Sequence, residues 1–307
     1  MLLAGKIPYA STFAVFAAGR AYDQIRNSIC YPNLNVKICS THAGITVGED
    51  GATHQMLEDI SMMRTLPNMT VMSVSDDTQT KWAVEEISKI KGPVYLRLSR
   101  METPIIYSET QKFEIGKAVQ IGEGTEASII ATGDVVCEAI KAKEELEKQG
   151  IKVRVIDMHT IKPIDKEMIV KCAKETKKII TLEDHSIIGG LGSAVCEVLS
   201  EEYPCKVTRM GINDQFGKSG KAEELLKYFK LTSEDIIEKV LEEISMDEHE
   251  RYLADLREKY ILDQNALEVT GFERAKTEIA KKLKDKNVDV EIIIKATNLT
   301  KEEIEKL

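Results

Sequence analysis

The sequence predicts an α/β protein with two parallel-sheet α/β domains and an appended helical tail. Up to about residue 212, apolar segments with strand-like spacing alternate with segments of helical spacing, which is the order of parallel sheets with crossover helices. The glycine-containing segment 113–125 divides this alternation, so we expect a linker there. After Gly220 the chain has no proline and one glycine, and Glu, Lys, Leu and Ile dominate, so we expect appended helices without a large core.

Composition places the chain among water-soluble globular proteins. Its 307 residues are 43% hydrophobic and 30% charged, enough for two ordinary domains. The net charge of −9 disfavours binding to nucleic acid or anionic membranes, since phosphate binding depends mainly on Lys and Arg. No apolar run reaches the roughly eighteen residues of a membrane helix. The six cysteines form no C-x-x-C pair, so we expect reduced thiols and a cytoplasmic location. From the net charge and the lack of a long apolar run, we expect no nucleic-acid partner and no membrane partner.

The first region, residues 1 to about 110, alternates three predicted helices with three predicted strands. The helices are expected at 13–31, 54–66 and 78–90. The strands are expected at 35–40, 69–75 and 94–100. In parallel sheets, ligands bind at the carboxyl ends of the strands. The polar loop "THAGITVGEDGATHQ", residues 41–55, directly follows one such strand and is therefore a candidate ligand-binding segment.

The second region repeats the same alternation. Strands are expected at 127–133, 152–158, 178–184 and 205–212. Helices are expected at 135–150, 165–177 and 191–203, the first of them ending at Gly150. Glycines in "EDHSIIGGLGSA", residues 183–194, resemble a phosphate cradle only loosely, so we expect them to allow close packing of helix on sheet, and we expect His185 to be structural.

The loop 41–55 carries His42, Asp50 and His54, which allow more than one role. Two imidazoles and a carboxylate suit a transition metal, but a spacing of twelve residues is not the helical spacing that makes a metal site convincing. Alternatively, Asp50 or Thr53 caps the next helix. Histidines at a strand's carboxyl end also favour proton transfer or hydrogen bonding to a polar substrate, which is compatible with capping.

Two further features lie near predicted strand or helix ends. Phe13 and Phe16 are three residues apart, which suits core packing or stacking on a flat heterocycle. Arg100 ends the strand "VYLRLSR", where its guanidinium either binds phosphate or forms a surface ion pair.

Four segments together resemble the transketolase family, namely "KIPYASTFAVFAAGRAYDQIRNS", "THAGITVGEDGATHQMLEDISMMRTLPN", "VYLRLSR" and "TLEDHSIIGGLGSAVCEVL". The resemblance runs from about residue 3 to about 240 and is to the separate C-terminal subunit of enzymes split over two chains. It implies a thiamine diphosphate pyrimidine-binding domain at 1–112, truncated at its N-terminus, and a transketolase C-terminal domain at 117–240.

The resemblance also implies residue roles. Phe13 and Phe16 match the aromatic residues that pack on the coenzyme's aminopyrimidine ring, although the third aromatic position of that pattern is Gly19 here. His42 and His54 match catalytic histidines that contact substrate oxygens and assist proton transfer.

Substrate binding is implied for two more positions. Asp50 matches the carboxylate that binds a substrate hydroxyl, and Arg100 matches the arginine that holds the substrate phosphate. No metal ligand is expected in this chain.

The implied activity is two-carbon ketol transfer between sugar phosphates, a transferase reaction of the pentose phosphate pathway that uses thiamine diphosphate. The G-D-G and Asn-Asn motif for diphosphate and Mg²⁺ (or Ca²⁺) is absent, so the resemblance implies an N-terminal partner subunit that holds the metal, in a dimer of heterodimers. The family's activating glutamate lies upstream of "KIPYASTF" and is also absent, which leaves the chain's own activity open.

Two alternatives remain at this point. One is a catalytically dead fragment or fusion that acts only as an interaction protein, because its activating glutamate is missing. The other is a related thiamine enzyme, such as deoxyxylulose phosphate synthase or the β subunit of a 2-oxoacid dehydrogenase, although the two histidines of the loop 41–55 fit transketolase better.

The tail, residues 246–307, resembles the helical C-terminal tails of the recombination-promoting nuclease and PD-(D/E)XK transposase group, without the nuclease core. Two short helices are expected around "TNLT". Residues 288–307 hold more acids than bases, which disfavours contact with DNA.

Overall fold

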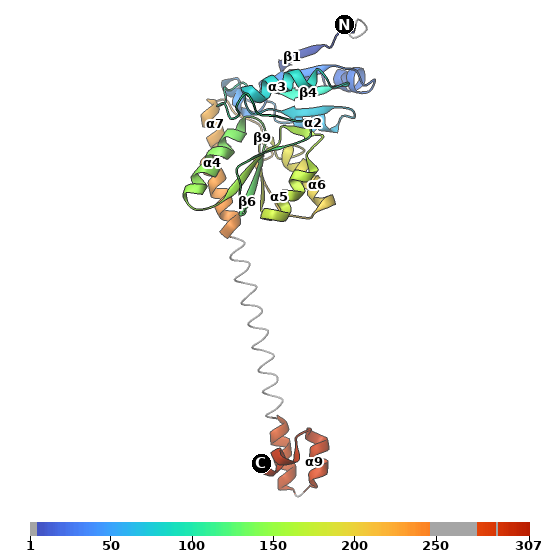
Figure 1. Cartoon of the computed structure of the whole chain (residues 1–307), viewed down its shortest axis with the longest axis vertical. Helices are drawn as coiled ribbons and strands as arrows, with labels where there is room; N and C mark the ends of the chain where they lie inside the picture. Colours follow the sequence, from blue (N-terminus) through green and yellow to red (C-terminus); the bar gives the residue numbers. More distant parts are fainter. Residues whose placement is uncertain (1–4, 246–274, 287) are drawn as a thin grey trace. The chain divides into compact units, whose positions relative to one another are not determined.

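The computed structural model describes residues 5–245, 275–286 and 288–307 (Figure 1). Its contacts divide the chain into one unit at Met1–Glu243 and another at Ile244–Leu307. The first unit contains two five-stranded sheets with helices packed on them, and the second is helical where it is described. The predicted fold class, two α/β domains with a helical extension, is confirmed.

The first sheet has the order β1-β2-β4-β3-β8. Its strands are β1 (Tyr9–Phe13), β2 (Lys37–Thr41), β3 (Thr70–Ser73), β4 (Val94–Arg97) and β8 (Thr160–Lys162). The first four are parallel, whereas β8 pairs antiparallel with β3. In the chain, β8 follows β7, which belongs to the second sheet, yet β8 pairs within the first sheet. The two sheets therefore cannot be separated by cutting the chain at one linker.

Helical segments connect the strands of the first sheet. They are η2 (Val15–Arg20), α1 (Tyr22–Gln24), η3 (Ile25–Cys30), η4 (Ile45–Asp50), α2 (Asp59–Thr65) and α3 (Asp77–Ile87). The helix expected at 54–66 begins only at Asp59, since residues 44–51 form a tight turn in which Gly44, Gly48 and Gly51 have positive φ.

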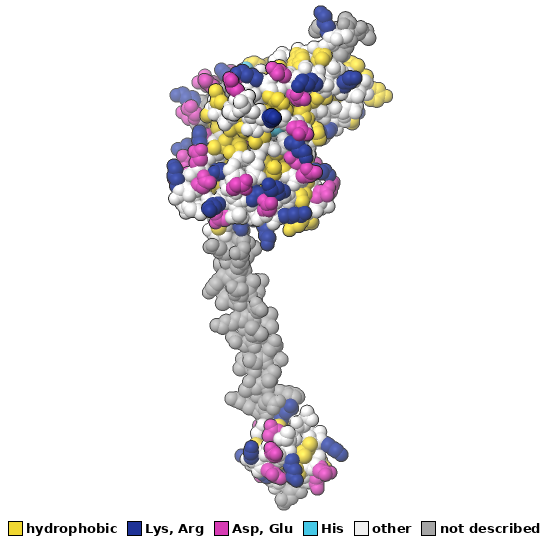
Figure 2. Space-filling model, viewed as in Figure 1, with side chains coloured by type: hydrophobic (Ala, Val, Ile, Leu, Met, Phe, Trp, Pro, Cys, Tyr) yellow, Lys and Arg dark blue, Asp and Glu magenta, His cyan; other side chains and the backbone are white. Residues whose placement is uncertain are grey.

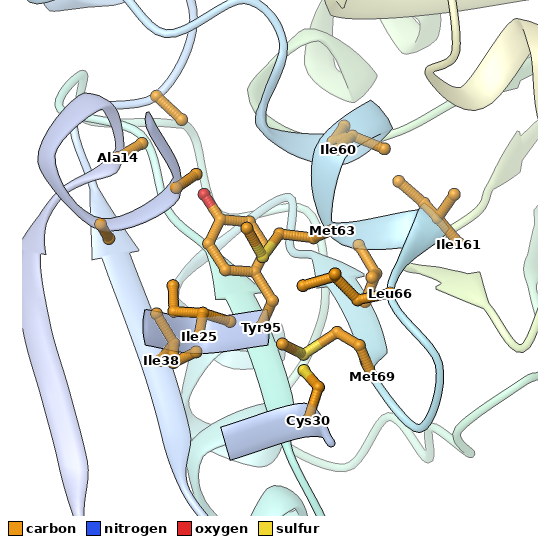
Figure 3. Close-up of a cluster of buried hydrophobic side chains, with 14 of the residues drawn as sticks. Ala14, Ile25, Cys30, Ile38, Ile60, Met63, Leu66, Met69, Tyr95 and Ile161 are labelled. Carbon is orange, nitrogen blue, oxygen red and sulfur yellow. The ribbon is translucent and has the colours of Figure 1, made fainter. Parts of the chain in front are cut away.

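Tyr95 of β4 lies at the centre of the first sheet's core (Figure 3). Apolar side chains from both flanking helical segments surround it in the close-up, among them Ile25, Met63 and Leu66. Ile161 of β8 belongs to the same buried cluster. A residue from the second half of the chain therefore completes the core of the first domain.

The second sheet has the order β10-β9-β6-β7-β5. Its strands are β5 (Val119–Ile121), β6 (Ala127–Ala131), β7 (Val153–Asp157), β9 (Ile179–Ser186) and β10 (Val207–Ile212). The connecting helices are η5 (Gly133–Val135), α4 (Val136–Lys148), α5 (Lys166–Thr176) and α6 (Leu191–Glu202). Figure 1 shows α5 and α6 on one flank of this domain and α4 on the other.

The expected linker 113–125 is partly wrong, because β5 lies within it and pairs antiparallel with β7. This short strand covers an edge of β7 that otherwise leaves main-chain groups unpaired. Both sheets are thus parallel with one antiparallel edge strand, rather than purely parallel.

Residues 221–243 also differ from the expectation that everything after Gly220 is appended. They form α7 (Ala222–Tyr228) and a helix over 233–245. Their apolar side chains are buried, and these are Leu225, Leu226, Phe229, Leu231, Ile236 and Val240. Their burial makes this stretch part of the first unit.

The second unit has a small core formed by Ala280, Ile293 and Ile304. It contains a helix over 275–285, α9 (Val290–Thr297) and α10 (Lys301–Lys306). The last two are the short helices expected around "TNLT", while expectations for 246–274 lie outside the described residues.

Within the described part of the chain, no helix combines the length and apolar character needed to cross a bilayer. On the face in Figure 2, acidic and basic side chains are interspersed over the first unit.

Candidate functional site

Four aromatic rings meet at the carboxyl ends of β1 and β2. The imidazole of His42 lies parallel to the ring of Phe13, with centroids 3.7 Å apart and planes 9° apart. Phe16 stacks beside Phe13 at 5.8 Å and 15°. His54 meets both phenyl rings edge-on, at 6.3 Å from Phe13 and 5.7 Å from Phe16. The structure therefore brings together the aromatic pair and both histidines that the sequence predicted as site residues.

Strand register explains how Phe13 and His42 meet. Phe13 is opposite Thr41 in the parallel pairing of β1 with β2, so the residue after Thr41 lies beside the Phe13 ring. His42 adopts φ of 58°, and its Nδ1 lies 2.9 Å from Thr41 Oγ1. A left-handed conformation at a non-glycine residue costs roughly 1–3 kcal/mol and persists where surrounding contacts impose it. Here the ring stack and the turn after β2 supply those contacts.

Asp50 and Arg100 form an exposed ion pair beside this ring cluster. Arg100 Nη1 donates to Asp50 Oδ2 at 3.0 Å and to the Val47 carbonyl at 2.7 Å. Burial lowers the pKa of His42, the positive charge of Arg100 lowers it further, and Asp50 acts in the opposite direction. All six predicted residues thus lie in one region, and the lowered pKa of His42 favours its neutral form.

A hollow of about 510 Å³ opens next to this region, at the carboxyl ends of β2, β3 and β4. It is lined in part by Thr41, Ser99 and Met101, the chain neighbours of His42 and Arg100. Ligands of α/β proteins are bound at this edge of the sheet.

The helix-capping alternative for the loop is wrong. The residue preceding α2 is Glu58, which makes no side-chain cap hydrogen bond. Asp50 instead pairs with Arg100, and Thr53 Oγ1 lies 3.0 Å from His54 Nδ1. Over residues 5–245, 275–286 and 288–307, no group of three or more His, Cys, Asp or Glu side chains is placed to hold a metal ion.

The glycines after β9 allow close packing, as predicted. A Cβ at Gly190 would lie 2.0 Å from Glu183 Oε2, and one at Gly192 would lie 2.7 Å from Thr181 Oγ1. The Glu183 carboxylate accepts hydrogen bonds from the Leu191 and Gly192 main-chain N–H groups, at 2.6 and 2.8 Å. It therefore fills the position at the start of α6 that a phosphate cradle would leave open.

His185 is structural, as expected. Its imidazole is fully buried, and its Nδ1 lies 2.7 Å from the Ser186 carbonyl. Burial lowers the pKa of His185 to about 4, so the ring is neutral.

Sequence reasoning missed a buried polar network beneath the loop. Arg97 Nε donates to Asp59 Oδ2 at 2.9 Å, and Arg97 Nη2 donates to the Asp184 carbonyl at 2.6 Å. The Asp184 carboxylate accepts from the Ile45 N–H at 2.9 Å, inside the loop. The only sequence signal for this network was the presence of charged residues within apolar strands, which is unusual because unpaired buried charge is costly.

Comparison with known proteins identifies relatives over most of the first unit. The family model described as transketolase, pyrimidine binding domain, matches residues 1–105, and that of the transketolase C-terminal domain matches 116–236. A protein of Methanocaldococcus jannaschii described as a transketolase C-terminal section is 52% identical over 246 residues, covering 79% of this chain and 77% of that protein.

Two further relatives are similar over comparable spans. A 6-deoxy-6-sulfo-D-fructose transketolase subunit of a Clostridium species is 42% identical over 233 residues, covering 76% of this chain and 72% of that protein. A solved structure described as a split gene transketolase, inactive β4 tetramer, has a TM-score of 0.74 and 49% identity, covering 79% of this chain and 78% of that chain. Taken with the matched domain models, these similarities show that the chain belongs to the transketolase family and contains its pyrimidine-binding and C-terminal domains.

Proposed function

We propose that the chain transfers two-carbon ketol units between sugar phosphates, with thiamine diphosphate and an N-terminal partner subunit. The observation that carries this proposal is the convergence of Phe13, Phe16, His42 and His54 beside the Asp50–Arg100 pair. An aromatic surface beside two imidazoles, a carboxylate and a guanidinium suits a heterocyclic coenzyme and a phosphorylated polyol.

The aromatic pair fits the aminopyrimidine ring of the coenzyme. Phe13 and Phe16 are partly exposed, nearly parallel and 5.8 Å apart, so they offer apolar ring faces at a strand end. When bound, the coenzyme supplies the electron sink that ketol transfer requires. The partner subunit holds its diphosphate with Mg²⁺ or Ca²⁺, because the sequence of this chain lacks the G-D-G and Asn-Asn motif.

The histidines handle protons on the substrate oxygens. A neutral imidazole has one N–H donor and one acceptor nitrogen, so it can accept a proton from a hydroxyl and return it. The lowered pKa of His42 favours this neutral form of its ring. His54, edge-on to both phenyl rings, contacts a second oxygen of the same substrate.

Asp50 and Arg100 recognise two different polar groups of the substrate, a hydroxyl and the phosphate. Asp50 accepts a hydrogen bond from a sugar hydroxyl. Arg100 uses Nη1 for Val47 and Asp50, while its guanidinium retains N–H groups on Nη2 and Nε that suit a phosphate.

Two relatives support the partner and the assembly. The Clostridium protein is described as a transketolase subunit, and the split gene transketolase neighbour is described as inactive in its β4 form. We infer the same requirement here: a partner chain completes the site, in a dimer of heterodimers.

The test is co-expression with a subunit that carries the G-D-G and Asn-Asn motif, followed by a ketol-transfer assay. Arg100→Ala should raise KM at least about tenfold for phosphorylated acceptors and leave unphosphorylated acceptors nearly unchanged, because only the former lose a charge-assisted contact. Arg26→Ala is the matched control, since its guanidinium contacts only Asn27 among the hydrogen bonds of the described residues.

A well-folded complex that binds coenzyme but transfers no ketol unit would reject the enzymatic proposal. The non-catalytic interaction protein would then be the better interpretation. An equal loss for both classes of acceptor would reject the phosphate-binding role of Arg100 alone.

A further inference from the structure

The second domain reaches the loop that carries the candidate site. None of the six candidate site residues comes from the second sheet or its helices. Nevertheless, the carboxyl ends of β6 and β9 point their acidic side chains at residues 45 and 46, which lie between His42 and Asp50.

Asp184 makes the principal contact. Its Oδ1 accepts from the Ile45 N–H at 2.9 Å, and its Oδ2 lies 3.4 Å from the Thr46 N. Both N–H groups are buried, and they lie in a turn that lacks a regular ladder to satisfy them. Buried main-chain donors without a partner are costly, so the carboxylate determines where this turn can lie.

Thr46 extends the contact to a second acidic residue. Its hydroxyl donates to Asp134 Oδ2 at 2.8 Å, and Asp134 follows β6, the strand beside β9. Two buried carboxylates next to one hydroxyl repel each other. Burial raises the pKa of Asp184, Asp134 raises it further, and the positive charge of Arg97 opposes both.

The loop's own backbone is shaped to this contact. Gly44 has φ of +80°, and a Cβ there would lie 1.9 Å from Asp184 Oδ2. Both the conformation and the close approach require glycine. The turn and the carboxylate therefore fit together in one arrangement.

A second contact holds the other end of the loop. Gln55 Nε2 donates to the Lys218 carbonyl at 2.8 Å and to the Ile45 carbonyl at 3.1 Å. A Cβ at Gly51 would lie 2.3 Å from Ser219 Oγ. Segment 217–220 of the second domain therefore packs directly on the loop, and the loop is fixed at both ends.

We infer that Asp184 is a positioning residue, through which the second domain fixes the loop 44–51 and thereby the places of His42 and Asp50. The inference rests on the proposed function only for its catalytic consequence. The structural part, that Asp184 holds the loop, stands independently.

Hydrogen–deuterium exchange of the full chain, followed by mass spectrometry of peptides covering 44–51, tests the structural part. Asp184→Ala should speed exchange in this segment by about tenfold or more, since two buried main-chain donors lose their acceptor. Asp184→Asn retains an acceptor oxygen and should stay within about threefold of the wild type. Thr46→Val provides a milder change and should also speed exchange in this segment.

Asp157→Ala is the matched control. Asp157 is also a buried carboxylate at the end of a strand of the second sheet, and it also reaches the first domain, through Ser75, Gln79 and Tyr107. It does not contact the loop. Faster exchange at 44–51 in Asp157→Ala equal to that in Asp184→Ala, or unchanged exchange in both Asp184→Ala and Thr46→Val, would overturn the inference.

The catalytic consequence is measured in the complex with the partner subunit. Asp184→Ala should lower kcat by about tenfold or more with coenzyme affinity unchanged, and Asp184→Asn should restore most of it. If wild-type complex shows no ketol transfer, the proposed function fails while the exchange result still decides the positioning role. Loop exchange that speeds up without loss of kcat in an active complex would overturn the catalytic part.

Discussion

Arg97 Nε lies 2.9 Å from Asp59 Oδ2, and these side chains are 3% and 0% exposed. This ion pair joins β4 to α2 directly beneath the loop that carries the candidate site. The same guanidinium donates to the Asp184 carbonyl, so one cation connects both domains. Burial alone would lower the pKa of Arg97, but the surrounding carboxylates, Asp59 foremost, raise it above its ordinary value.

Breaking this ion pair should therefore cost much more than breaking an exposed one. Asp59→Asn leaves the Arg97 charge buried without its carboxylate, and we expect the free energy of unfolding to fall by about 3–5 kcal/mol. Urea denaturation followed by circular dichroism measures it. Glu167→Gln, which removes the exposed pair with Lys117, is the control and should cause no measurable change. Equal effects of the two substitutions would contradict the assigned role of the buried pair.

The pKa of His42 should respond in opposite directions to its two charged neighbours. Arg100→Gln removes a positive charge that disfavours the imidazolium, so the pKa of His42 should rise. Asp50→Asn removes a negative charge that favours it, so the pKa should fall. Nuclear magnetic resonance titration of the histidine side chains gives both values. Arg26→Gln should leave the pKa of His42 unchanged. A shift of the same sign in Arg100→Gln and Asp50→Asn would refute the opposite effects assigned to these two charges.

His159 should make the protein less stable in acid. It is fully buried, and burial lowers its pKa to about 4, whereas an unfolded histidine titrates near ~6.5. Between these values the unfolded chain binds a proton that the folded chain does not. The free energy of unfolding therefore decreases as the pH falls through this window, and the contribution of His159 is fully present above it.

Replacing this histidine should remove that dependence. For His159→Gln, the loss of unfolding free energy between pH 7 and pH 4.5 should be about 2 kcal/mol smaller than for the wild type. Denaturation curves at the two pH values measure the difference. Between pH 7 and pH 8.5 the free energy of unfolding should change by the same amount in the two proteins. If the two unfolding free energies changed equally down to pH 4.5, the pKa of His159 would be the same in the folded and the unfolded chain.

Phe16 should contribute to coenzyme affinity in the assembled complex. Phe16→Leu keeps an apolar side chain but removes the ring that lies parallel to Phe13, so the Kd for thiamine diphosphate should rise roughly three- to tenfold. Calorimetric titration of the complex measures it. Phe113→Leu changes a ring in a different aromatic cluster, with Trp82 and Tyr107, and should leave the Kd unchanged. An unchanged Kd in Phe16→Leu would argue against coenzyme stacking there.

The repeating pattern of apolar residues was sufficient for most of the fold. It predicted seven of the strands and the principal helices, because strands buried on both faces leave short continuous apolar runs and amphipathic helices leave a local period of about 3.6 residues. It missed β1, β5 and β8. Four of the five residues of β1 are exposed, and β5 and β8 have three residues each, so none of them contains an apolar run long enough to be recognised as a strand. They are strands because a neighbouring edge pairs with them.

For the candidate site too, some residues were found from the sequence and others only from the structure. His42, Asp50 and His54 lie on one continuous loop, Phe13 and Phe16 were expected at the start of a helix, and Arg100 was expected at the end of a strand. Their residue types and positions in the sequence were enough to make them candidates. Asp184 is 139 residues from Ile45 and was not among these candidates. Its role depends on parallel strands of the second sheet ending against the loop of the first, where a buried carboxylate must find main-chain donors. Local pattern thus determined which residues were candidates for chemistry, whereas only tertiary packing decided which buried groups hold them in place, because the cost of desolvating a charge is settled by neighbours distant in the chain.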